Sequence, residues 1–308
     1  MPTSNPSACA VMLANGRPDM VARAVKSFRA QTYEPKLLLI LDSGRTPSCD
    51  IPMLIFDVSE ILGNIYQQCE STSIGALRNE ANKRAAELTE CDIIVHWDSD
   101  DWSHPNRIAE QVALLQSSGA ECVGYSEMLF WVSSREAHFY GHGYTPGIVY
   151  CACGKAWPRT YGRCDKCKAA PPDAEAWLYR SSLPNYSIGT SMCYWRETWD
   201  RTPFPDYSEG CDDLYWFNGD KKSGVKPVKI ESVSSVPRRL NQSERDEYAR
   251  VVKQYYPDEV PANLKLPDES PRMIASIHGG NTCAAIKPGV EWTRVADWDD
   301  FARGAMKL

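Results

Sequence analysis

Three carboxylates stand close together in residues 96–102, where Asp98, Asp100 and Asp101 follow the short apolar run 93–95. That run is β-branched and predicts a buried strand. Carboxylate oxygens are the ligands that hard divalent cations prefer, and a bound cation can in turn hold phosphate oxygens. Side chains alternate along an extended strand end, so we expect Asp98 and Asp100 to face one side, with Asp101 as the third candidate. The alternative is a solvated acidic turn that caps the next helix.

The elements ahead of these acids predict a parallel sheet. Residues 8–14 and 37–41 are apolar runs typical of buried strands, and apolar residues recur at helical spacing over residues 20–31. A strand, a helix and a strand joined by short links form a βαβ unit with parallel strands. Asp42 directly follows the second strand. In open α/β sheets ligands bind outside the carboxyl ends of the strands, which is where Asp42 and the later acids would gather.

Five short motifs follow one another in roughly the first 130 residues. In chain order they are Asn15-Gly-Arg-Pro, Ser27-Phe-Arg-Ala-Gln-Thr-Tyr33, Leu41-Asp42-Ser-Gly, Gly75-Ala-Leu-Arg78-Asn79 and Asp98-Ser-Asp100-Asp101. Each motif is weak alone, but the ordered set resembles the inverting family-2 glycosyltransferases with the GT-A fold. The resemblance implies an α/β fold with a Rossmann-like, mostly parallel central sheet flanked by helices. One departure is that Ser43 stands where the family usually has a second acid after Asp42.

The resemblance also implies which side chains bind the donor. Nucleotide contacts are implied for Asp42, Arg78, Asn79 and Asp98. A Mn²⁺ or Mg²⁺ ion on the diphosphate is implied to have the ligands Asp98, Asp100, Asp101 and His278. Without the resemblance, His278 would be a hydrogen-bonded histidine in a glycine turn, although neutral imidazole is a normal partner of carboxylates on Mn²⁺.

A pair of acids in the second half of the chain is the candidate general base. Asp212 and Asp213 precede a segment with a helical apolar face, where helix capping alone would explain them. The resembled family has a Gly-Glu-Asp motif at this place, and its Asp is the catalytic base. Alignment on Gly210 makes Asp212 the base and puts Cys211 where Glu is expected. If the acidic pair replaces Glu-Asp, Asp213 is the base.

Four clustered cysteines interrupt the α/β pattern. They are Cys151, Cys153, Cys164 and Cys167, within residues 135–172, where glycine, proline, aromatic and basic residues dominate. Their spacing predicts a structural zinc knuckle, and a metal would supply the stability that so small an insert lacks. Three cysteines with His138 or His142, a redox-labile cluster and ordinary free thiols are the alternatives. The insert is also basic, which suits either a solvated face or a clamp for an anionic acceptor.

Composition limits the class of protein. The 308 residues carry a net charge of −6 with a pI near 5.5, which disfavours a broad nucleic-acid-coating surface. No apolar run approaches the roughly 20 residues of a membrane helix, and the N-terminus lacks a signal-peptide pattern, so we expect a cytoplasmic protein. The other eight cysteines are dispersed, as small buried hydrophobic residues are.

We therefore expect a glycosyltransferase of the EC 2.4 class that inverts configuration and takes a nucleotide-diphospho-sugar, most readily a UDP-sugar. The expected parts are a nucleotide-sugar half (1–134), the zinc insert (135–182), an acceptor and catalytic half (183–285) and a tail packing on the core (286–308). The acceptor hydroxyl could belong to a glycan, a protein or a modified nucleic acid. Rival hypotheses are a nucleic-acid-binding zinc protein, a glycosyltransferase acting on modified DNA bases or another polyanion, and a nucleotidyltransferase, which would leave Asp212 and His278 without a role.

Overall fold

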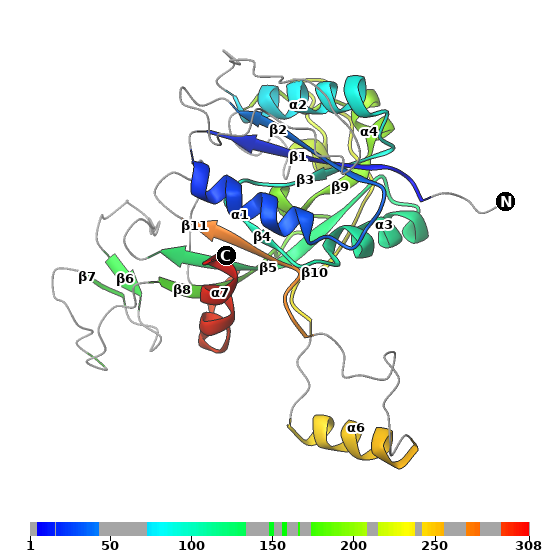
Figure 1. Cartoon of the computed structure of the whole chain (residues 1–308). Coiled ribbons are helices and arrows are strands. Elements are labelled where there is room, and N and C mark those ends of the chain that lie inside the picture. The colour runs from blue at the N-terminus through cyan, green and yellow to red at the C-terminus, as the bar shows by residue number, and fades with distance from the viewer. Residues whose placement is uncertain are drawn as a thin grey trace.

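The computed structural model is an α/β fold. It describes residues 5–15, 17–42, 73–133, 148–150, 156–158, 166, 174–207, 215–237, 242–255, 269–277 and 291–307. One ten-stranded sheet has the order β12-β8-β5-β9-β3-β1-β2, with β10 and β11 paired to β5 and β4 paired to β11. Helices cover both faces of this sheet (Figure 1). The expected α/β sheet between helices is confirmed.

The strands and helices have the following bounds. The strands are β1 (Ala8–Ala14), β2 (Lys36–Asp42), β3 (Ile93–His96), β4 (Trp102–Ser103), β5 (Cys122–Ser133), β6 (Ile148–Tyr150), β7 (Ala156–Pro158), β8 (Ala174–Arg180), β9 (Cys193–Trp195), β10 (Ile230–Ser234), β11 (Met273–Ile277) and β12 (Trp292–Arg294). The α-helices are α1 (Pro18–Arg29), α2 (Ile74–Thr89), α3 (Arg107–Ser118), α4 (Arg196–Arg201), α5 (Tyr215–Asn218), α6 (Gln242–Tyr255) and α7 (Asp299–Met306). Two 3₁₀ turns are η2 (Gly189–Ser191) and η4 (Ala296–Trp298).

The N-terminal strands form the predicted parallel unit. β1 pairs in parallel with β2 on one side and β3 on the other, and Ala14 lies opposite Asp42 at the last step of the β1–β2 register. Successive side chains of β1 alternate between the faces, so Ala10 packs with α1 and α3 while Val11 packs with α2. All three strands end at one edge of the sheet, and the acids follow the end of β3.

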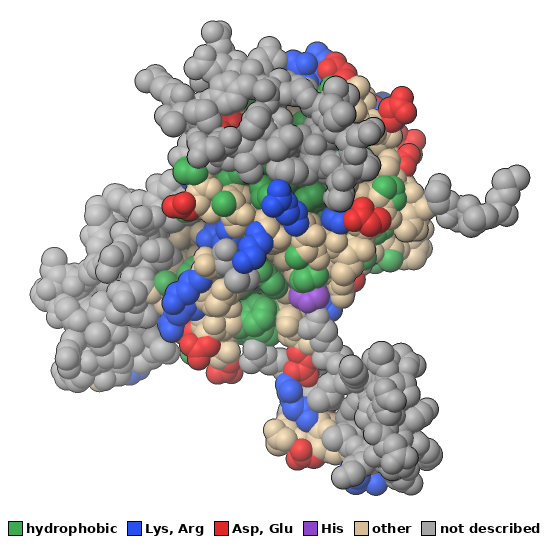
Figure 2. All heavy atoms as spheres, in the orientation of Figure 1, with side chains coloured by type: hydrophobic (Ala, Val, Ile, Leu, Met, Phe, Trp, Pro, Cys, Tyr) green, Lys and Arg blue, Asp and Glu red, His purple; other side chains and the backbone are tan. Residues whose placement is uncertain are grey.

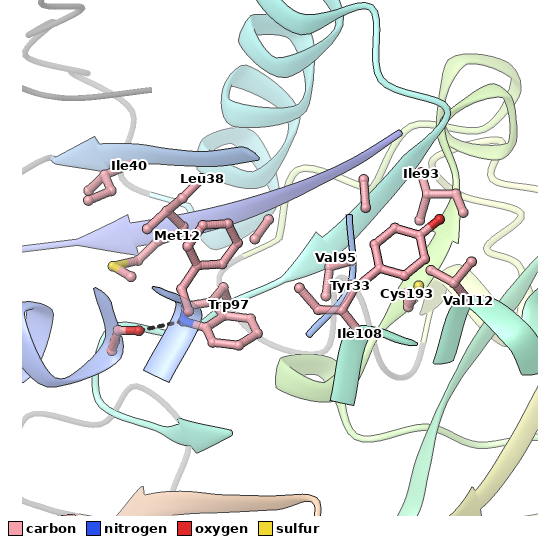
Figure 3. Close-up of a cluster of buried hydrophobic side chains, with 14 of the residues drawn as sticks. Met12, Tyr33, Leu38, Ile40, Ile93, Val95, Trp97, Ile108, Val112 and Cys193 are labelled. Carbon is pink, nitrogen blue, oxygen red and sulfur yellow. Dashed lines mark hydrogen bonds between the residues drawn. The ribbon is translucent and has the colours of Figure 1, made fainter. Parts of the chain in front are cut away.

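Trp97 fixes the chain where it leaves β3. Its indole Nε1–H donates to the Ala24 carbonyl in α1 at 3.0 Å, and its ring meets Phe28 edge to face. Only 1% of Trp97 is exposed, and it lies in a cluster of buried side chains from α1, α3 and the parallel strands (Figure 3). The acidic residues that follow are therefore anchored to the core by the residue before them.

Beyond β3 the sheet becomes mixed. β9 runs antiparallel to both β3 and β5, and β8 runs antiparallel to β5, whereas β10 and β11 lie parallel to β5. The apolar residues 185–196 do not form one continuous strand but contain the η2 turn and the short strand β9. Gly124 in β5 explains the close approach of this segment, since a Cβ there would lie 1.9 Å from Ser187 Oγ.

The C-terminal residues 291–307 pack on the sheet. β12 pairs with β8, and α7 buries Ala302 and Ala305 against Ile274 and Leu129. Helix α6 lies away from the sheet in Figure 1. No described helix is both long and apolar enough to cross a membrane.

Candidate functional site

A tight turn brings the three acids together. Residues 98–101 leave the strand, and the Asp101 amide donates to the Asp98 carbonyl at 3.4 Å. One carboxylate oxygen from each of Asp98, Asp100 and Asp101 lies within 4.8 Å of the others. We expected alternation along an extended strand end to select two of the three acids. The chain turns instead, and all three carboxylates converge.

Each acid has a different partner. Arg78 Nη2, from α2, donates to Asp98 Oδ1 at 2.8 Å, and Arg17 Nη1, from the residue before α1, donates to Asp100 Oδ2 at 3.1 Å. Asp101 is held by neutral donors. The Ser276 amide of β11 donates to its Oδ1 at 3.0 Å, and the hydroxyl of Thr190 in η2 donates to its Oδ2.

The surroundings of Asp98 and Asp101 shift the pKa values of these two acids in opposite directions. Burial raises the pKa of Asp101 well above its usual value, and the nearby carboxylates of Asp100 and Asp98 raise it further. Burial also acts to raise the pKa of Asp98, but the charge and hydrogen bond of Arg78 outweigh it, so the net shift is downward. A cation placed between the three carboxylates would relieve the repulsion felt by Asp101.

Arg107 supports the acidic turn (residues 98–101) through hydrogen bonds to the backbone and side chains around it. Its guanidinium is fully buried and donates to the His96 carbonyl at 2.8 Å, the Thr190 carbonyl at 3.1 Å and the Ser103 hydroxyl at 2.9 Å. The same guanidinium lies 5.0 Å from the centre of the Trp97 ring. Arg107 therefore links the end of β3, β4 and η2, the elements that surround the acidic turn.

His96 is a neutral structural histidine beneath the site. It is fully buried, with Nδ1 at 2.7 Å from the Gly189 carbonyl and Nε2 at 3.2 Å from the Tyr194 hydroxyl. A carbonyl can only accept, so Nδ1 carries the proton, and Nε2 accepts from Tyr194. Burial, with help from the positive charge of Arg78, lowers the pKa of His96 well below its usual value.

The start of α2 is closed by residues 204–207. Ser73 caps the helix through the Ala76 amide, and the Gly75 amide donates to the Tyr207 carbonyl at 3.0 Å. Asn79 donates to the Phe204 carbonyl at 2.8 Å and accepts from the Phe204 amide and from Trp199 Nε1. Asn79 thus pins this segment to α2, and its predicted contact with a nucleotide stays a prediction.

Of the remaining predicted site residues, the structure describes only Asp42. Asp42 ends β2 and is 7% exposed, on the sheet edge that β3 also reaches before the acidic turn. Asp212, Asp213, His278 and the cysteines Cys151, Cys153, Cys164 and Cys167 lie outside the described residues. The nearest described residue to Asp212 and Asp213 in the sequence is Tyr215, which begins α5, and the nearest to His278 is Ile277, which ends β11. The base, histidine and zinc assignments stay predictions.

The residues present suit a hard divalent cation. The three converging groups are all carboxylates, the donors that Mg²⁺ and Mn²⁺ prefer, and none is a soft sulfur ligand. The same turn also contains the hydroxyl oxygen of Ser99, which is buried and has no hydrogen-bond partner among the described residues. The donor chemistry therefore fits the expected metal.

The solved structures that match the chain include two determined with a nucleotide-sugar, both at low sequence identity. The mannosyltransferase PcManGT from Pyrobaculum calidifontis, in complex with GDP-Man and Mn²⁺, is 14% identical with a TM-score of 0.39, over 84% of this chain and 67% of that one. S. aureus TarS 1–349 in complex with UDP-GlcNAc is 12% identical with a TM-score of 0.38, over 79% of this chain and 64% of that one. Because the TM-scores lie below 0.5, these likenesses assign neither a family nor an activity. No family model and no curated protein matches the sequence.

Three residues at the site were given no role by the sequence analysis. Arg17 lies in one of the five motifs, but nothing in its neighbours predicts a pair with Asp100. Thr190 lies in an apolar stretch of the sequence, and its short side chain carries no signal by itself. Arg107 sits at the start of a helix, where an arginine is ordinarily a solvated residue. Only their contacts identify them.

Proposed function

We propose that the protein is a metal-dependent inverting glycosyltransferase that moves a sugar from a nucleotide-diphospho-sugar to an acceptor hydroxyl. The observation that carries the proposal is the convergence of Asp98, Asp100 and Asp101 beyond the carboxyl ends of parallel strands. Ligands of open α/β sheets bind at that edge. Asp42 ends a strand there, and Arg78 contacts Asp98, so both are candidates to bind the nucleotide. The ordered motifs of the sequence support the same assignment.

The proposed site residues would have the following roles. Asp98, Asp100 and Asp101 hold Mn²⁺ or Mg²⁺, and His278, two residues after Ser276, joins them in the proposal. A bound cation supplies Lewis-acid stabilisation of the charge that builds on the leaving diphosphate. Asp42 and Arg78 orient the nucleotide.

The proposed base is Asp212, with Asp213 as the alternative. It removes the proton from the acceptor hydroxyl as that oxygen attacks the anomeric carbon from the face opposite the diphosphate, which inverts the configuration. General-base assistance of this kind is worth about two to four orders of magnitude in rate. Variants Asp212→Asn and Asp213→Asn would separate the two candidates, and full activity in both would exclude the assignment.

The direct test is a donor panel with Mn²⁺. UDP-, GDP- and TDP-sugars are mixed with the protein, and release of the nucleoside diphosphate is measured with and without a chelator. We expect UDP-sugars to be used most readily, and we expect Asp100→Asn to lower turnover on the order of 100-fold or more, because several kcal/mol of charge stabilisation is lost. Asp246→Asn, an exposed position in α6, is the matched control. Metal-independent turnover, or an unaffected Asp100→Asn, would contradict the proposal.

A further inference from the structure

Arg23 links the C-terminal helix α7 to the backbone of the acidic turn. From the middle of α1, it donates through Nη2 to the Asp100 main-chain carbonyl and through Nη1 to the Met306 carbonyl at 2.9 Å. Met306 is the last residue of α7, where a carbonyl has no donor within its own helix. One guanidinium therefore caps α7, whose C-terminal end lies beside α1 in Figure 1, and holds the main chain of a proposed metal ligand.

A pair of aromatic rings joins the same two parts of the molecule. Trp102 directly follows Asp101, and its ring meets the ring of Phe301 in α7 edge to face, with the ring centres 5.6 Å apart. Both rings are partly buried against the hydrophobic cluster that α7 covers. Helix α7 is thus joined to the residues before and after Asp101, by Arg23 and Phe301 respectively.

The position of α7 depends on such contacts. With eight residues, α7 is too short to be stable as an isolated helix. It buries Ala302 and Ala305 on the sheet, and Asp299 at its start accepts from the Ala176 amide of β8 at 2.8 Å. The start of α7 is therefore fixed to the sheet, and its end is fixed to α1 by Arg23.

The charge and the hydrogen bonds of Arg23 should affect a bound cation in opposite directions. Burial lowers the pKa of the Arg23 guanidinium, and the nearby carboxylates of Asp101 and Asp100 oppose that shift. A positive charge this close to the acids repels a cation, whereas hydrogen bonds to two main-chain carbonyls hold the turn in place. Arg23 would therefore help cation binding through the geometry that it imposes, and not through its charge.

We propose that Arg23 is a positioning residue, which transmits the docked position of α7 to the acidic turn and keeps the three carboxylates close enough to bind a divalent cation. The inference rests on the proposed function and adds α7 to the parts of the chain that the metal site needs. The three carboxylates meet within 4.8 Å, a spacing that a shift of the Asp100 main chain would widen. Loss of a group that orients metal ligands typically lowers metal affinity about 10- to 100-fold.

The test measures Mn²⁺ affinity from the electron paramagnetic resonance signal of the free ion, in variants that circular dichroism shows to be folded. Arg23→Lys keeps the positive charge but has no planar fork to hold the two carbonyls. We expect it to bind Mn²⁺ about tenfold more weakly, with an altered spectrum of the bound ion. Arg23→Met, which also removes the repelling charge, should still bind Mn²⁺ more weakly than the wild type.

The controls remove charges elsewhere on α1 and α7. Figure 2 shows Lys and Arg side chains on the face of the molecule where α1 lies, so a general effect of positive charge has to be measured separately. Lys26→Gln, at an exposed position on α1, and Arg303→Gln, in an exposed ion pair with Asp300 on α7, remove one positive charge each. Both variants should leave the Mn²⁺ affinity unchanged.

A substitution in α7 tests the part that the helix plays. Phe301→Leu removes the ring contact with Trp102 but keeps an apolar side chain, so we expect it to weaken Mn²⁺ binding several-fold. Wild-type affinity in this variant would show that the docking of α7 does not position the turn, and it would overturn the inference.

The remaining outcomes separate this inference from the proposed function. If Asp100→Asn leaves Mn²⁺ binding unchanged, the acids do not form the metal site and both proposals fail. If Asp100→Asn weakens Mn²⁺ binding but Arg23→Lys binds as tightly as the wild type, the positioning role is overturned while the site stands. Tighter binding by Arg23→Met would show that Arg23 acts on the cation through its charge, which also overturns the positioning role.

Discussion

At the scale of single residues, the site consists of three acids that we propose bind a cation and of buried residues that support the backbone around them. The three acids converge on one point, whereas His96 and Arg107 lie wholly inside the protein and contact backbone carbonyls. A buried histidine two residues before an acid cluster could be taken for a metal ligand. Both of its ring nitrogens are engaged by Gly189 and Tyr194, so its role is structural.

His96 should make stability depend on pH near neutrality. Its pKa in the folded protein is well below the usual value of about 6.5, so below that pH the unfolded chain binds a proton that the native protein does not. Native stability is therefore fully present above about pH 6.5 and falls as the pH drops, with a contribution of at most about 1.4 kcal/mol per pH unit from this group.

Urea unfolding of the wild type and His96→Gln between pH 7.5 and 5 checks this expectation. The variant should have a lower free energy of unfolding at pH 7.5, because it loses the buried imidazole and its hydrogen bonds. Its free energy of unfolding should fall less steeply as the pH is lowered. His104→Gln controls for the loss of a partly exposed histidine. Equal acid slopes in the wild type and in His96→Gln would show that His96 takes a proton in the folded protein.

At the scale of elements, the contact between α2 and residues 204–207 depends on a glycine. A Cβ on Gly75 would lie 1.9 Å from the Pro205 carbonyl oxygen, a backbone atom that cannot move without shifting its segment. Asn79, one turn later, holds the same segment through Phe204. Because α2 also carries Arg78, this packing sets where the partner of Asp98 stands.

The substitution Gly75→Ala should destabilise the protein by about 1–3 kcal/mol, the usual cost of overpacking. Gly304→Ala is a matched control, since Gly304 lies in α7 with open space where the alanine Cβ would stand. That change should stabilise the protein by about 0.5–1 kcal/mol through helix propensity. Thermal unfolding compares the two, and a Gly75→Ala protein as stable as wild type would mean that residues 204–207 are not closely packed on α2.

At the scale of the whole molecule, distant segments of the chain build the site around one sheet edge. Asp101 contacts Thr190 and Ser276, which are 89 and 175 positions away, and Arg23 joins α1 to the C-terminal helix α7. The acids follow a parallel strand, while η2 and β11 contribute the groups that hold Asp101. Substitutions far from the acids in sequence should therefore alter metal binding.

The cysteine insert should carry its own metal. We expect about one zinc per chain by elemental analysis, lost in Cys164→Ser and in Cys167→Ser, because thiolate pairs at this spacing bind structural zinc. Cys122→Ser, at a dispersed cysteine buried in β5, should leave the zinc content unchanged. Zinc-free protein with four reactive thiols in the insert would instead support ordinary free cysteines.

The sequence by itself determined the parallel unit and the place of the acids along the chain. Apolar runs and helical spacing are local patterns, so β1, α1, β2 and β3 lie within a residue or two of their expected bounds. The buried state of Cys9, Cys91, Cys122 and Cys193 followed from composition in the same way.

Only the tertiary structure decided how the acids are presented and what holds each one. A turn after β3 brings three carboxylates together where an extended strand end would have separated them, and that turn depends on Trp97 packing on α1. The partners Arg17 and Thr190 lie 83 and 89 positions from the acids that they contact. No local pattern encodes such contacts, because they arise from how the sheet and its helices pack.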